Sequence, residues 1–294
     1  MDITYYRESE SYDLISLLFG VLSLLIALFV VGYVYQFAMS IVPIIYLNVL
    51  ICAGTSYLIS LILRLLFRLA KIRSFKVRLY LIATAILAFT YFQWSAFLGS
   101  LLSEEFLGLG AYLESLTLIF NADLIITLFK DLYTYGTFSI GSIQHGIPVN
   151  QSLYVVLWII EFGLLALFSA LLIKKYGVLP FSENTGKWYP KYLLEDNFKV
   201  AWSEQAVLEG IKEKGLLEYL EEHKYGDAIK HLKFFVYYLE EEHQAYLTVE
   251  KHQIADRGKG KKEVSPLIEN LRIDKQLALQ ILDKFSNERV RLAI

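Results

Sequence analysis

The residue whose chemistry fits its surroundings least is Glu161, which lies inside a long apolar segment in the run Trp-Ile-Ile-Glu-Phe-Gly. An ionised carboxylate that faces lipid is costly, so Glu161 should either face other helices or carry a proton. One interpretation is a proton or ion site, or a gate in a conduction path. The other is a structural carboxyl group that accepts hydrogen bonds from neighbouring helices.

Weakly polar side chains in two other apolar segments are the predicted partners of Glu161. One segment contains Gln93. The other carries small or polar residues spaced by four, which places them on one stripe of a helix: Asn48, Cys52, Ser56 and Ser60. Because such stripes more often pack helices together than line pores, we interpret this one as a packing face. Asn48 and Gln93 are the candidates for polar contacts with Glu161 inside the membrane.

The sequence carries no local signature of an enzyme. It contains no Gly-x-Ser-x-Gly elbow, no Walker phosphate loop and no dinucleotide-binding glycine pattern. The five histidines form no zincin-type motif, and the single cysteine, Cys52, excludes an intramolecular disulfide and a cysteine-based zinc site. We predict no catalytic residue, no metal and no cofactor, and lean against an enzyme. An intramembrane enzyme with a site built from scattered residues stays an alternative.

The elements that must position these residues divide the chain into two parts. Residues 1–176 hold 20 charged side chains, whereas the shorter remainder, residues 177–294, holds 38. This contrast predicts an apolar part in the bilayer and a second part in water. The net charge of −2 gives no general attraction to nucleic acid, so no nucleic-acid partner is expected.

Four runs are long and apolar enough to cross a bilayer, whose core of about 30 Å requires roughly 20 residues of helix. The uncharged stretch from Leu14 to Leu63 is too long for one span. We place the break between its two spans at Gln36 to Pro43, where the proline suits a tight hairpin. The predicted spans are residues 14–35, 44–66, 79–102 and 152–173.

A fifth apolar segment, residues 113–129, contains Asp123. Placing this carboxylate in the middle of the bilayer would cost roughly 2.5–3.5 kcal/mol on insertion scales. We therefore predict an interfacial or re-entrant helix within an outer loop formed by residues 103–151, with Asp123 as its acidic site.

The distribution of basic residues predicts the orientation. Five lie between residues 68 and 78, after the second span, and two, Lys174 and Lys175, follow the fourth. The loop 103–151 contains Lys130 as its one basic residue. We expect an integral multi-pass protein of the plasma or inner membrane, with both termini in the cytoplasm, including the N-terminal residues 1–13.

The C-terminal part is predicted to be a connector, residues 177–202, followed by a small α+β domain, residues 203–294. Ser203 to Glu222 has helical spacing with a serine cap, and 274–285 is an amphipathic helix. Between them, β-branched and aromatic residues at 233–239 and 246–254 favour two or three strands, with one long helix over 227–254 as the alternative. Three aromatic residues of the connector could lie at the lipid headgroups or pack against the domain: Trp188, Tyr189 and Tyr192.

The expected fold is therefore an α-helical polytopic membrane protein, with about four transmembrane helices and a small cytoplasmic α+β domain. Function is less constrained, because this layout serves unrelated activities. We favour a non-enzymatic scaffold, sensor or complex subunit anchored in the lipid bilayer. It would bind a protein partner, or form a homo-oligomer, through residues 177–294. The alternatives are a homo-oligomeric channel or transporter with Glu161 near the conduction path, and a membrane-embedded enzyme.

Overall fold

The computed structural model describes residues 3–42, 45–103, 109–135, 139–140, 147–148, 151–174, 179–256, 261–286 and 291–292. The chain forms two compact units. The helical unit is Ser9–Tyr176, and the sheet unit combines Met1–Glu8 with Gly177–Ile294.

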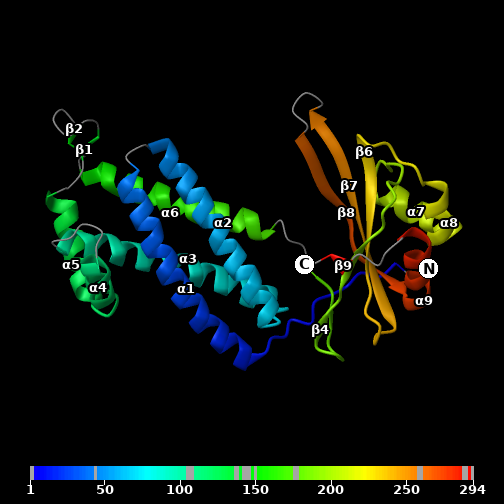
Figure 1. The fold of residues 1–294 in the computed structure, drawn as a ribbon, viewed down its shortest axis with the longest axis horizontal. Coiled ribbons are helices and arrows are strands. Elements are labelled where there is room, and N and C mark those ends of the chain that lie inside the picture. Colours follow the sequence, from blue (N-terminus) through cyan, green and yellow to red (C-terminus); the bar gives the residue numbers. More distant parts are fainter. Residues whose placement is uncertain are drawn as a thin grey trace. The chain divides into compact units, whose positions relative to one another are not determined.

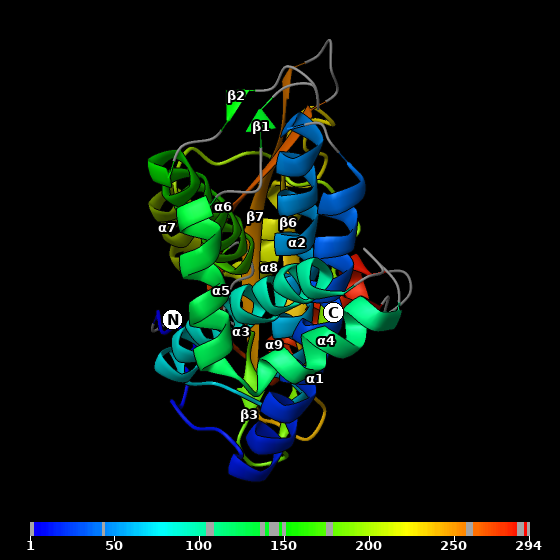
Figure 2. The same ribbon diagram turned by 90° about the vertical axis from the view of Figure 1, so that its left-hand side faces the viewer.

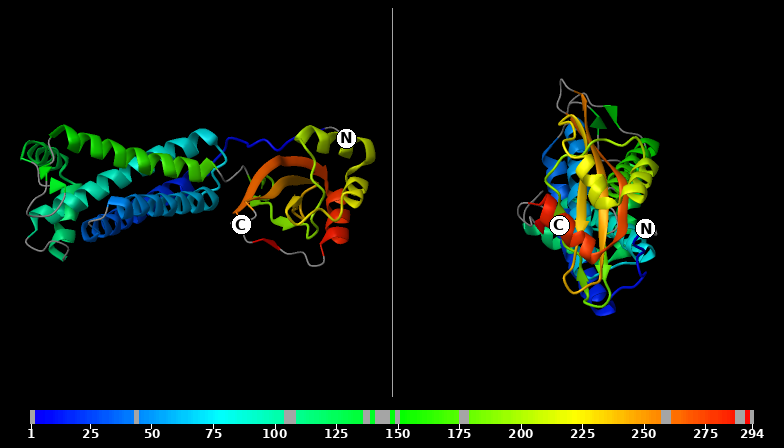
Figure 3. Two further views of the ribbon diagram at one scale, coloured as in Figure 1. Left: turned by 90° about the horizontal axis from the view of Figure 1, so that it is seen from above. Right: turned by 90° about the vertical axis from the view of Figure 1, so that its right-hand side faces the viewer.

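Four long helices form the helical unit: α1 (Leu14–Ile41), α2 (Ile45–Leu69), α3 (Phe75–Leu102) and α6 (Gln151–Lys174). They run alongside one another (Figure 3), with α1 packed on α2 and α3, and α2 packed on α6. Among the described residues, α1, α2 and α3 are long and apolar enough to cross a membrane, and α6 has a shorter apolar stretch, Val155–Leu171. Within the described ranges, three helices could therefore span a bilayer, or four if a bent pair of helices over residues 112–134 counts as one span.

Two of the long helices extend four or more residues beyond their predicted limits. Helix α1 continues to Ile41, beyond the predicted end at residue 35. Gln36 and Ser40 are one turn apart, and their side chains hydrogen-bond at 3.2 Å, so polar residues continue the helix where we expected a hairpin. Helix α3 begins at Phe75, four residues before the predicted start, because the Ser74 side chain accepts a hydrogen bond from the Val77 amide.

The segment predicted as one helix over 113–129 forms two, α4 (Leu109–Ile119) and α5 (Ala122–Tyr135). Their axes are bent by 114°, which fits a broken span or a re-entrant loop (Figure 2). The break occurs because the Asn121 side chain accepts a hydrogen bond from the Leu124 amide at 3.1 Å and so starts a new helix. A short antiparallel hairpin, β1 (Ser139–Ile140) and β2 (Ile147–Pro148), follows; the other residues of 136–150 lie outside the described residues.

The sheet unit contains an antiparallel sheet with the strand order β8-β7-β6-β5-β9. The strands are β5 (Lys191–Leu193), β6 (Lys230–Tyr237), β7 (Gln244–Asp256), β8 (Lys261–Asp274) and β9 (Arg291–Leu292). Helices α7 (Glu204–Lys214), α8 (Leu216–Glu222) and α9 (Lys275–Phe285) lie on one side of the sheet (Figure 1) and enclose an apolar core with it. The α+β prediction for this part is confirmed, and the alternative of one long helix over 227–254 is wrong.

The residues predicted as a connector take part in the fold of this unit. A small hairpin, β3 (Phe181–Ser182) and β4 (Lys187–Trp188), precedes β5, which pairs with β6 in the main sheet. Trp188 packs edge-on against Phe181, and Tyr189 is buried next to Tyr246. The connector aromatics Trp188 and Tyr189 therefore pack against the unit.

The N-terminal segment covers the edge of the sheet at β8. The Tyr6 amide donates to the Asn270 carbonyl at 2.9 Å, and the Arg272 amide donates to the Thr4 carbonyl at 2.8 Å. The Tyr6 ring also packs edge-on against Tyr246. Because an open edge strand leaves backbone groups unpaired, this added segment completes the sheet on that side.

Candidate functional site

Glu161 lies at the centre of a hydrogen-bonded cluster that takes one side chain from each of the four long helices. The Tyr35 hydroxyl of α1 donates to Glu161 Oε1 of α6 at 2.7 Å. The Gln93 amide of α3 approaches the same oxygen at 3.4 Å. The Tyr35 oxygen also lies 3.0 Å from Cys52 Sγ of α2. We call these four residues the Glu161 cluster.

Three members of the cluster are buried, and Glu161 is half-buried. Tyr35, Cys52 and Gln93 are 2%, 3% and 4% exposed, respectively. Since the Tyr35 hydroxyl proton points to Glu161, its oxygen is free to accept from the Cys52 thiol. The Cys52 thiol can therefore donate to the Tyr35 hydroxyl, which donates to the Glu161 carboxylate. The Gln93 amide is a second donor to the same carboxylate. Such a row of hydrogen bonds can fix the register of four helices, and it can also relay a proton over this short distance.

Gly32 brings α1 and α3 close together beside the cluster. A Cβ atom at this position would lie 3.0 Å from the Gln93 backbone nitrogen, a distance that side chains rarely tolerate. Tyr35 lies three residues further along α1, on the neighbouring turn, and its ring packs edge-on against Phe89 of α3. The small residue at position 32 therefore helps Gln93 and Tyr35 to reach the same carboxylate.

The stripe of small residues on α2 lies against α6. The Ser56 and Ser60 hydroxyls donate to carbonyls of their own helix, and lie 3.4 Å and 3.5 Å from the Leu165 and Ser169 carbonyl oxygens of α6. This is the helix-packing arrangement that the residue types favour. Ser56 contacts Leu165, and Ser60, one turn later on α2, contacts Ser169, one turn later on α6. The two helices therefore run in the same direction.

The other candidates, Asn48 and Asp123, do not join Glu161. Asn48 lies one turn before Cys52 on α2, and its buried Oδ1 has no hydrogen-bond partner among the described residues. Asp123 is exposed in the first turn of α5, where a carboxylate is favoured by the helix dipole. Sequence reasoning therefore identified Glu161 and Gln93 of the cluster, and Tyr35 was missed.

Tyr35 has no distinguishing signal in the sequence, because it contacts a residue 126 positions away and stands at the end of an ordinary apolar run. Cys52 was predicted to lie on a helix-packing stripe, and that prediction did not include its contact with Tyr35. No combination of spacings within one segment identifies contacts across four helices.

The face of the sheet opposite the helices carries a half-buried charged group around Glu250 of β7. Its carboxylate lies 3.4 Å from Lys191 Nζ and 3.2 Å from His252 Nε2. The His252 ring stacks on His231 of β6, with 5.5 Å between the ring centroids. Burial lowers the pKa of His231 and outweighs the Asp227 carbonyl contact, which raises it. No cluster of three or more metal-ligating side chains occurs in the described part of the chain.

Two large aromatic side chains project from the sheet unit into solvent. Trp202 is 90% exposed and Tyr225 is 85% exposed. The neighbours of Tyr225, Lys224 and Gly226, pair with the backbone of residues 197–199. Trp202 follows that stretch by three residues. Both aromatic residues therefore belong to one edge of the unit. The Lys230 ammonium lies 5.4 Å from the Trp202 ring centroid, within cation–π range. We call Trp202, Tyr225 and Lys230 the aromatic surface.

Comparisons of the chain with protein-family models, with curated proteins and with solved structures find no match.

Proposed function

We propose that this protein is a membrane-anchored scaffold, sensor or complex subunit whose sheet unit binds a cytoplasmic protein. The aromatic surface carries the proposal. Tryptophan and tyrosine are the residue types most often found at the energetic centres of protein interfaces, and here two are exposed on one edge of a folded unit. Because aromatic residues are enriched at protein interfaces, their exposure here favours a surface at which a partner protein binds.

The Glu161 cluster supports an anchoring role for the helices over a conducting one. Its polar groups contact one another inside the bundle, and the serines of the α2 stripe are satisfied by helix carbonyls. A conduction path requires a succession of polar groups that exchange partners with water or ions. A cluster that joins four helices instead favours a role in holding the bundle in one arrangement.

The N-terminal segment supports an even number of membrane crossings. Residues 4 and 6 hydrogen-bond to β8, in the unit that follows α6, which supports an arrangement in which both ends of the helical unit emerge on the same side of the bilayer. Crossings by α1, α2, α3 and α6 satisfy this, with the bent pair α4–α5 entering and leaving on one side. The parallel α2 and α6 agree with such a four-span arrangement, since both would then cross in the same direction.

The basic loop between α2 and α3 supports a cytoplasmic location for both termini. Arg73 of this loop donates from Nε to the Ser9 and Ser11 hydroxyls at 3.1 Å, which ties the start of the chain to the basic residues. Basic loops are retained in the cytoplasm. We propose on this basis that the sheet unit is cytoplasmic.

The experiment that tests the partner is native purification of the full chain in mild detergent, with particle mass and bound proteins measured by mass spectrometry. The variant Trp202→Ser/Tyr225→Ser removes the aromatic surface, and Val264→Ser, on an exposed residue elsewhere in the same unit, is the matched control. We expect a stoichiometric partner with the wild type and the control, and its loss from the double variant.

Two results would contradict the proposal. Retention of the partner by the double variant would show that another surface binds it. A homogeneous homo-oligomer without a second protein would favour the channel or transporter, and would direct attention to Glu161.

A further inference from the structure

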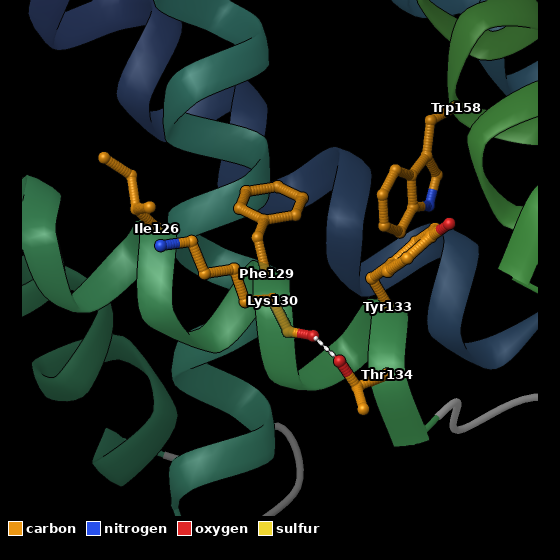
Figure 4. Close-up of a pocket in the computed structure, with 6 residues that line it drawn as sticks. All are labelled: Ile126, Phe129, Lys130, Tyr133, Thr134 and Trp158. Atoms are coloured by element: carbon orange, nitrogen blue, oxygen red, sulfur yellow. Dashed lines mark hydrogen bonds between the residues drawn. The ribbon is translucent and has the colours of Figure 1, made fainter.

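A pocket lies between α5 and α6 of the helical unit, apart from the Glu161 cluster. Its volume is about 510 Å³, which is within the range of small-molecule sites. Five of its described lining residues come from α5 and one, Trp158, comes from α6. They are Ile126, Phe129, Lys130, Tyr133, Thr134 and Trp158 (Figure 4).

One wall of the pocket is a rigid group of aromatic rings. Phe129 of α5 and Trp158 of α6 have ring centroids 5.5 Å apart, and Trp94 of α3 packs behind both at 4.6 Å and 5.1 Å. Rings from three helices therefore contact one another and hold the wall in place. Tyr133 and Ile126 extend this apolar lining along the exposed side of α5.

The charged group of the pocket is Lys130. Among the residues that the structure describes, its ammonium has no acidic partner, and its backbone carbonyl accepts the Thr134 hydroxyl at 2.7 Å. It is also the one lysine or arginine of the sequence between residues 103 and 151. In the view of Figure 4, its ammonium lies beside Ile126, and Trp158 lies at the opposite end of the row of lining residues.

The nearest acids along α5 do not neutralise this end of the pocket. Asp131 is the next residue, about 100° further around the helix, and Asp123 lies two turns earlier. Neither forms an ion pair with Lys130 among the described residues. A cation at one end of an aromatic and aliphatic lining is therefore available to a ligand.

We infer that this pocket binds an amphiphile with one anionic headgroup and one apolar chain, of the chemical class of a fatty acid. The headgroup would contact the Lys130 ammonium, and the chain would lie on Phe129, Tyr133 and Trp158. The pocket is open on one side, and its volume accommodates one apolar chain. This inference does not depend on the partner proposed for the sheet unit.

The four tryptophans of the chain allow a direct binding test. Trp94 and Trp158 report on the pocket, and Trp188 and Trp202 are removed as Trp188→Phe and Trp202→Phe. The full chain carrying these two changes is reconstituted in zwitterionic phosphatidylcholine nanodiscs. The probe is a fatty acid with bromine atoms on its chain, which quench indole fluorescence on contact.

We expect saturable quenching, with the apparent Kd raised about fivefold or more by Lys130→Gln and nearly unchanged by Lys130→Arg. Lys76→Gln, on an exposed lysine at the start of α3, is the matched control and should bind like its parent. A brominated fatty alcohol, which lacks the charge, should bind the parent about as weakly as the acid binds Lys130→Gln.

Quenching that rises linearly without saturation would mean simple partition into lipid and would overturn the inference. An unchanged Kd for Lys130→Gln would overturn the assignment of the headgroup to Lys130. Nanodiscs that contain brominated phosphatidylglycerol form the second arm of the experiment. Strong quenching there that an unbrominated fatty acid cannot reverse would assign the pocket to a phospholipid and overturn the single-chain ligand.

Discussion

The Tyr35 hydroxyl donates a hydrogen bond of 2.7 Å to the Glu161 carboxylate, joining the first and last long helices of the bundle. The tyrosine is 2% exposed, so no solvent molecule takes its place when the hydroxyl is removed. We expect Tyr35→Phe to lower the free energy of unfolding by about 1–3 kcal/mol, because it leaves the half-buried Glu161 carboxylate and the buried Cys52 thiol with fewer partners. Thermal unfolding of the full chain in detergent measures this change.

The matched control for Tyr35→Phe is Tyr80→Phe, which removes the same atom from an exposed position on α3. It should leave the melting temperature nearly unchanged. Equal melting temperatures for the two variants would contradict a structural role of the Tyr35–Glu161 hydrogen bond.

The Glu161 carboxyl group itself separates anchoring from conduction. Glu161→Gln keeps the size of the side chain and its ability to accept from Tyr35, and it removes the titratable group. If the helices anchor the protein, we expect no change of ion or proton flux into liposomes relative to wild type, with expression and melting temperature retained. A wild-type flux above that of empty liposomes that falls at least about tenfold in Glu161→Gln would favour the channel or transporter instead.

The close contact between α1 and α3 at Gly32 predicts opposite outcomes for two glycine substitutions. Gly32→Ala places a Cβ 3.0 Å from the Gln93 backbone nitrogen, so the helices must move apart, at a cost of about 1–3 kcal/mol. Gly54→Ala, on α2, meets no atom within 4 Å and should be neutral or stabilise by up to about 1 kcal/mol through helix propensity. Melting temperatures in the reverse order would show that the α1–α3 contact is not tightly packed.

The pairing of residues 4 and 6 with β8 predicts where the two ends of the helical unit emerge. In a Cys52→Ser background, single cysteines at Glu10→Cys and Glu263→Cys should react with an impermeant maleimide from the same side of sealed vesicles. Ser142→Cys, in the predicted outer loop, should react from the other side. Labelling of positions 10 and 263 from opposite sides would mean an odd number of crossings, and α4–α5 would then count as a span.

The long apolar helices could be predicted because a bilayer leaves a strong composition signal, and three of the four predicted spans correspond to helices of sufficient length. Their ends were less accurate, because local contacts such as Gln36 with Ser40 decide where a helix stops. The α+β character of the last third also followed from its residue types. The β8 partner of the N-terminal segment did not, since it lies more than 260 residues away and such pairings leave no local pattern.

The candidate site likewise contains residues that the sequence predicted and residues that it did not. Glu161 was found because an acid inside an apolar run is rare, and Gln93 because it is polar in such a run. Tyr35 is an amphipathic residue that is common near the ends of spans, so its sequence position gave no reason to pair it with Glu161. The exposure of Trp202 likewise depends on which strands surround it, which composition does not determine.

His231 predicts a pH dependence of the sheet unit. Burial lowers its pKa in the folded protein, with the charges of His252 and Lys233 acting in the same direction, while the unfolded value is about 6.5. As the pH falls through about 6.5, the unfolded chain binds a proton at this position before the folded chain does, so the free energy of unfolding decreases. Above about pH 7.5 both states are neutral there, and the group contributes no pH dependence.

We expect His231→Gln to lose less stability than wild type between about pH 8 and pH 5.5, as measured by the melting temperature of the full chain. The control His243→Gln, at an exposed position, should follow wild type. The same slope in all three proteins would show that burial at His231 does not shift its titration.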